Sequence, residues 1–84
     1  MNLNLIKMYI NKIKKNDVES FLNNNEINVN ENELDYLYDI LKNKYTNVLD
    51  EDQETFDEIK KNISSSNFDK LIKLYNKYKD LHLR

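Results

Sequence analysis

Acidic side chains near the middle of the chain have the spacing that comes closest to a metal site. Asp50, Asp52 and Glu54 alternate as the first ligands of a calcium-binding loop do. Thr55 stands where that loop needs glycine for its sharp turn, and Lys61 stands where it needs a bidentate glutamate. The sequence therefore predicts no calcium site at this place.

The residue types that acid–base catalysis needs are also poorly placed. The one histidine, His82, lies two residues from the end of the sequence, where chains usually fray. Asp35 and Asp39 share a helix face, but such pairs are common on any acidic helix. A catalytic histidine needs an orienting partner and a pocket, and the sequence indicates neither. We therefore expect a non-enzymatic protein without catalytic residues.

Gly, Pro and Cys are all absent from the chain. The absence of cysteine excludes disulfides, thiol catalysis and thiolate metal sites. Tight β-hairpins, phosphate-binding loops and dinucleotide-binding turns rely on glycine, so β-rich folds and cofactor-binding folds are not expected. We expect an all-α protein without a cofactor, in which Asn replaces Gly at the ends of helices.

Apolar residues recur at spacings of three and four, which predicts four to five short helices in a compact orthogonal or irregular bundle. We take the whole of residues 1–84 as one helical domain. The apolar positions of the predicted helices are, in chain order, Leu5, Ile6, Tyr9, Ile10 and Ile13; Val18, Phe21 and Leu22; Leu34, Leu37, Tyr38, Leu41 and Tyr45; Phe56, Ile59 and Ile63; and Phe68, Leu71, Ile72, Tyr75 and Tyr78. An extended connector over residues 26–30 is predicted between the second and third helices, with Ile27 and Val29 in the core.

Capping patterns mark where several of these helices begin. A capping box places a small polar residue three positions before Glu or Gln. The candidate pairs are Asn16 with Glu19, Asn30 with Glu33, and Asp50 with Gln53, and serines 64–66 supply a cap for the last helix.

The third predicted helix carries more apolar surface than one core face needs. Tyr36 and Ile40 fall well to the side of the stripe that begins at Leu34. Together with Asp35 and Asp39 they are the candidate partner-binding surface. The alternative is that this helix is central and packed from two sides.

Charge is strongly segregated along the chain, although the net charge is only −2. Residues 31–59 hold ten acids and two lysines, whereas residues 60–84 hold seven basic and two acidic residues. The acidic middle could attract a basic protein or mimic nucleic acid. The alternative is a solvated face whose counter-charge is the basic last helix.

Basic and apolar clusters define two further hypotheses. Lys12, Lys14 and Lys15 are the candidate contacts for nucleic acid, with a helix, an extended loop and a helix over residues 18–41 that is similar to some DNA-binding modules. The spacing of the last helix also allows a homodimer seam, against which ordinary core packing is the alternative. The seam residues are Leu71, Leu74, Tyr78 and Leu81. No apolar run is long enough for a membrane span or a signal peptide, so we expect a cytoplasmic protein.

Four groups of capping and packing residues follow one another in an order found in a known family. They are residues 16–22 (NDVESFL), residues 27–29 (INV), the helix with Leu34, Leu37 and Leu41, and residues 48–53 (VLDEDQ). Over residues 9–79 the chain thus resembles an uncharacterised family of small all-helical proteins from low-GC Gram-positive bacteria, a domain of unknown function. The resemblance implies an all-helical bacterial protein and assigns no functional residues.

The leading functional hypothesis is therefore a small helical adaptor or regulator that binds another protein. A nucleic-acid-binding module and an acidic nucleic-acid mimic or inhibitor are the alternatives.

Overall fold

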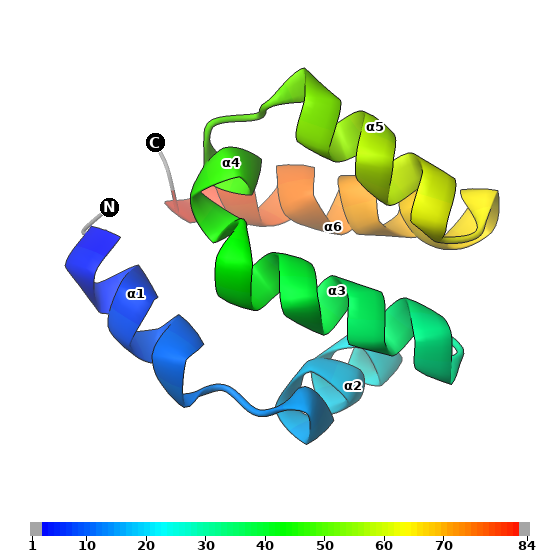
Figure 1. The fold of residues 1–84 in the computed structure, drawn as a ribbon, viewed down its shortest axis with the longest axis horizontal. Helices are drawn as coiled ribbons and strands as arrows, with labels where there is room; N and C mark the ends of the chain where they lie inside the picture. Colours follow the sequence, from blue (N-terminus) through cyan, green and yellow to red (C-terminus); the bar gives the residue numbers. More distant parts are fainter. Residues whose placement is uncertain (1–2, 83–84) are drawn as a thin grey trace.

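The computed structural model describes residues 3–82, of which Leu3, Asp80, Leu81 and His82 are described by their backbone only. Within this range the chain forms six α-helices and no β-strand (Figure 1). The helices are α1 (Leu3–Lys12), α2 (Lys15–Asn24), α3 (Glu31–Asn43), α4 (Tyr45–Leu49), α5 (Gln53–Asn62) and α6 (Ser65–His82). The radius of gyration of 12.3 Å matches the ~12 Å expected of a compact chain of this length. The predicted all-α class is confirmed, but the predicted count of four to five helices is too low.

The uncounted helix is α4, which the sequence pattern merges into the end of α3. The backbone of Lys44 leaves the helical region, with φ −132° and ψ 22°, and its N–H still donates to the Ile40 carbonyl at 2.8 Å. A new helical turn then starts at Tyr45. Apolar spacing does not indicate such a break, because Leu41 before it and Tyr45 after it are both half-buried.

Helix α3 lies at the centre of the structure, between α2 on one side and α5 and α6 on the other (Figure 1). Leu34 packs in one buried cluster and Ile40 packs in another. The first cluster consists of Val18, Leu22, Ile27 and Leu34, and the second of Ile40, Ile59 and Ile63. Leu37 and Leu71 contact both clusters and connect them into one core.

The predicted helix starts are partly correct. Asn30 and Glu33 form the expected capping box, and the Ser64 hydroxyl caps α6 by accepting from the Asn67 N–H at 3.2 Å. The predicted start of α2 at Asn16 is wrong, because Asp17 accepts from the N–H of Lys14, the residue before the helix, at 2.9 Å.

The predicted start of α5 at Asp50 is also wrong. Asp50 is the C-cap of α4, and Asp52, two residues further on, is the N-cap of α5. The Asp52 carboxylate accepts from the backbone N–H of Thr55 at 3.0 Å and from its hydroxyl at 2.7 Å.

Two glutamates end helices in the left-handed conformation that favours glycine. Glu26 follows α2 with φ 62°, and Glu51 follows α4 with φ 56°. Behind Glu26, the Ile27 N–H reaches back to the Leu22 carbonyl at 2.9 Å, the long hydrogen bond of a Schellman motif. Ile27 is thereby turned into the core, where 1% of it is exposed. The expectation that Asn would replace Gly at helix ends is partly correct: Asn25 is the C-cap of α2, but with φ −103° it is not left-handed, and Glu26 takes that conformation.

We expect Glu26→Gly to stabilise the protein by up to about 1 kcal/mol. A left-handed residue with a Cβ is destabilised by roughly 1–2 kcal/mol relative to glycine. Glycine also gives the unfolded chain more conformational freedom, which offsets part of this gain. Chemical unfolding of the two proteins measures the difference. The control is Glu26→Ala, which removes the same carboxylate but keeps the Cβ. Equal stabilities of the Gly and Ala variants would contradict the explanation.

Candidate functional site

The predicted partner-binding surface on α3 is not a surface. Only 5% of Ile40 is exposed, and it packs against Ile59 and Ile63, so its prediction as a docking residue is wrong. Tyr36 is half-buried against the same cluster, and burial together with the nearby Glu58 carboxylate raises the pKa of its hydroxyl. The physical reason is the central place of α3, which is packed from two sides.

The two acids predicted beside that patch are exposed and have contacts within the protein. Asp35 forms an ion pair with Lys15 of α2, and Asp39 accepts a hydrogen bond from Asn43 at 2.7 Å. The hydrogen bond with Asp35 raises the pKa of Lys15 above its ordinary value. Exposed contacts of this kind add little to stability.

The three lysines predicted to contact nucleic acid lie at the end of α1 and the start of α2. Lys12 and Lys14 are exposed, and Lys15 is engaged by Asp35. The Asp17 carboxylate also bonds the backbone N–H of Lys14. Carboxylates therefore interrupt the predicted basic cluster.

The predicted dimer seam on α6 faces largely inward. Leu71 and Leu74 pack against the first core cluster, and the Tyr78 ring packs on Phe21 with centroids 5.9 Å apart. The side chain of Leu81 lies outside the described residues, as does that of His82. Ordinary core packing explains Leu71 and Leu74, whereas Tyr78 is exposed.

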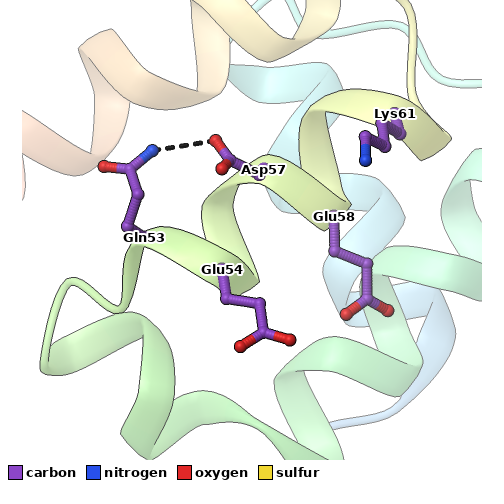
Figure 2. A pocket seen from close by; sticks show the side chains of 5 residues that line it. All are labelled: Gln53, Glu54, Asp57, Glu58 and Lys61. Atoms are coloured by element: carbon purple, nitrogen blue, oxygen red, sulfur yellow. Dashed lines mark hydrogen bonds between the residues drawn. The ribbon is translucent and has the colours of Figure 1, made fainter.

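The outer side of α5 carries the exposed part of the acidic segment (Figure 2). Glu54, Asp57, Glu58 and Lys61 border a shallow polar hollow, and Asp57 accepts from Gln53 at 2.8 Å. All five come from one helix, so no second element shapes a site for a ligand. We interpret this side of α5 as a solvated helix face.

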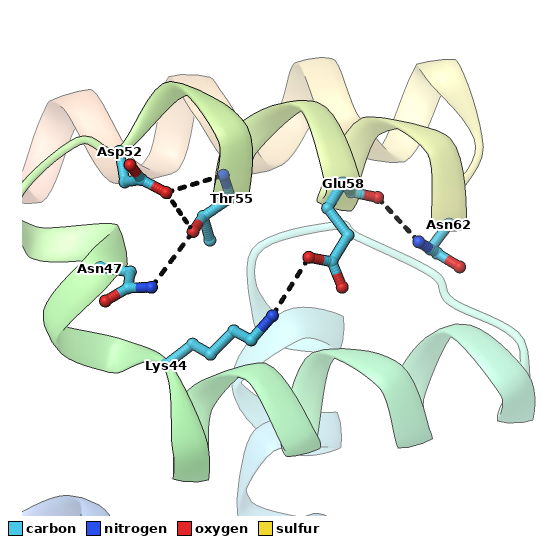
Figure 3. Close-up of polar contacts among 6 residues, drawn as sticks. All are labelled: Lys44, Asn47, Asp52, Thr55, Glu58 and Asn62. Carbon is cyan, nitrogen blue, oxygen red and sulfur yellow. Dashed lines mark hydrogen bonds and ion pairs between the residues drawn. The ribbon is translucent and has the colours of Figure 1, made fainter.

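Polar contacts attach α5 to the segment before it (Figure 3). Glu58 pairs with Lys44 at 3.1 Å, and Asn47 donates to the Thr55 hydroxyl at 3.4 Å. Further along, Glu51 pairs with Lys79 of α6 at 2.6 Å, the kind of counter-charge expected from the last helix. Lysines of the same fold thus neutralise part of the negative charge of the acidic segment.

A buried polar cluster joins the starts of α3 and α6, with 8% of Glu33 and 7% of Asn67 exposed. The Glu33 carboxylate accepts from the backbone N–H of Ser64 at 2.7 Å and of Asn30 at 3.1 Å. Asn67 donates to the Asn28 carbonyl at 3.0 Å and to Glu33 at 3.3 Å. The Ser64 and Asn30 N–H groups hold the pKa of Glu33 below its ordinary value, although burial opposes them. We interpret the cluster as a structural joint.

The most exposed large apolar side chains among the described residues lie on α1. Leu5, Met8 and Tyr9 are 64%, 55% and 66% exposed. Their i, i+3, i+4 spacing places them on one side of the helix, here called the α1 outer face. Ile6 and Ile10 lie next to this face and, together with Tyr9, line a cavity. The sequence contains a signal for this exposure. At 100° per residue, the apolar residues of α1 span about 200° of its circumference, which is more than one buried side needs.

Other classes of site find no support in the described residues. Within residues 3–82, no three His, Cys, Asp or Glu side chains are grouped so as to hold a metal ion. In the same range, no helix combines the length and the apolar character needed to cross a bilayer.

Comparison of the chain with protein-family models, with curated proteins and with solved structures finds no match in any of the three. The resemblance to a bacterial helical family therefore stays a prediction.

Glu33→Gln tests the contribution of the buried carboxylate. Because the folded-state pKa is depressed, Glu33 adds stability that is fully present above its ordinary pKa of 4.5 and is lost as the pH falls through the lower folded value. We expect the substitution to lower the free energy of unfolding by about 1–3 kcal/mol near neutral pH. The difference from the unsubstituted protein should shrink as the pH falls below 4.5. Urea unfolding at a series of pH values measures both effects.

The matched control is Glu31→Gln, which removes an exposed carboxylate from the same helical turn. It should change stability far less. A Glu33→Gln difference that stayed constant throughout the acid range would show that the ionised state is not what stabilises the fold.

Proposed function

We propose that this chain is a non-enzymatic protein-interaction module that binds its partner through the α1 outer face. The supporting observation is the exposure of Leu5, Met8 and Tyr9 together on one side of one helix. Single exposed apolar residues are ordinary, but adjacent large ones are typical of interaction surfaces. Met and Tyr are also residue types enriched in such surfaces.

The charges around the α1 outer face indicate the chemistry of the partner. Helix α1 contains no acid, and its exposed Lys12 lies one turn after Met8 and Tyr9. Lys14 follows directly after it and is also exposed. An amphipathic helix whose apolar stripe is flanked by carboxylates complements this surface in shape and in charge. We take a helix of that kind, from another protein, as the partner.

The nucleic-acid alternatives have less support. Phosphate binding relies on a continuous positive surface, whereas Asp17 and Asp35 lie beside Lys14 and Lys15. A nucleic-acid mimic relies on a strong negative field. Of the acids in the middle segment, Glu51 and Glu58 face lysines and Glu33 is buried.

Photo-crosslinking in cells of the native host tests the proposal. A benzoyl-phenylalanine introduced in place of Leu5 should give one predominant cross-linked protein. Its cross-linked segment should be an amphipathic helix with carboxylates beside the apolar stripe. A second substitution, Met8→Gln, should reduce the yield at least about tenfold, since a central contact in an interface is worth 2 kcal/mol or more.

The control places the same photoreactive residue at Glu54, which is exposed on α5. It should give none of that product. Cross-links confined to the Glu54 position would move the interface to the acidic side of α5. Cross-links from Leu5 to a second copy of the chain would replace a foreign partner by a homodimer. Either result contradicts the proposal.

A further inference from the structure

A cavity of about 470 Å³, partly open to solvent, is lined by members of both core clusters and by residues around them. Each of the six helices contributes apolar side chains to its wall. Examples, one from each helix in chain order, are Ile10, Leu22, Leu41, Val48, Phe56 and Ile72. No charged side chain is among the described residues that line it.

The cavity has the size and the lining of a site for a small organic molecule. Sites that take small organic molecules measure roughly 300–1,000 Å³ and are lined mainly by apolar side chains. The cavity lies in that range, and its wall has the same chemistry.

Two polar groups at the cavity are bonded within the protein. The Tyr75 hydroxyl donates to the Val48 carbonyl at 3.2 Å, and the Lys42 ammonium donates to the Ile10 carbonyl at 2.6 Å. A charged or strongly polar ligand would lose its hydration without gaining partners here. An uncharged aliphatic or aromatic molecule loses nothing comparable on entering.

From this wall and this volume we infer that the cavity is a binding site for one small uncharged apolar molecule. The inference goes beyond the proposed interaction with a protein, because it concerns the inner side of α1. Tyr9 belongs both to the α1 outer face and to the cavity wall, so the two proposed sites meet at this residue.

Helix α1 provides the entrance. Of the helices that the structure describes, α3 is the one whose backbone approaches it closely. Hydrogen bonds from Lys42 and Tyr38 of α3 reach the carbonyls of Ile10 and Ile13, at the C-terminal end of α1. The exposed members of the cavity wall, Tyr9 and Phe21, mark the side on which it meets solvent. An outward tilt of α1 about its C-terminal end would widen this opening.

Fluorescence titration of the full chain with N-phenyl-1-naphthylamine, an uncharged apolar fluorophore, tests the site. We expect saturable binding of one molecule per chain, a rise in Tm with fluorophore concentration, and shifts of the methyl resonances of Ile10 and Ile72. Leu41→Phe, which adds volume to the wall, should weaken binding about tenfold or more while the protein unfolds cooperatively.

The matched control is Leu5→Phe, the same enlargement on the α1 outer face, which should leave the affinity within about twofold. Ile72→Phe repeats the filling test on α6 and replaces Leu41→Phe if that variant does not fold. Three results would each overturn the inference. They are binding that does not saturate, binding that folded filled variants retain unchanged, and binding only under conditions that abolish the near-ultraviolet circular dichroism of the native state.

Discussion

Helix α3 has to bury apolar side chains on two sides at once, and the arrangement of the other helices follows from this constraint. Leu34 requires α2 and the connector on one side, whereas Ile40 requires α5 on the other. Leu71 of α6 then contacts both clusters and closes the core. Because the apolar interior is continuous through α3, substitutions on this helix are expected to affect both halves of the structure.

The buried joint around Glu33 sets how α3 and α6 begin relative to each other. One carboxylate caps its own helix through the Asn30 N–H and holds the chain before α6 through the Ser64 N–H. A buried carboxylate is costly unless donors surround it, and here backbone groups and the Asn67 amide supply them. The joint therefore specifies a geometry that apolar contacts alone would leave adjustable.

Helix α1 has the opposite character, since it carries apolar residues on more of its circumference than one neighbour covers. Its inner side closes over a cavity, and its outer side exposes Leu5, Met8 and Tyr9. The other large apolar side chains that the structure describes are less exposed than these three. Both functional proposals concern α1 because apolar surface that folding does not bury is available for binding.

The sequence by itself determined the helical class, most helix positions and two of the starts. Periodicity, the absence of glycine, and the caps at Asn30 and Ser64 are local features, and each acts within a few residues. Only the tertiary structure decided that Ile40 is core, that Leu5 and Met8 are surface, and that Glu33 meets Asn67. Spacing along a helix shows which residues share a side, but the side that is buried depends on which distant helix packs there.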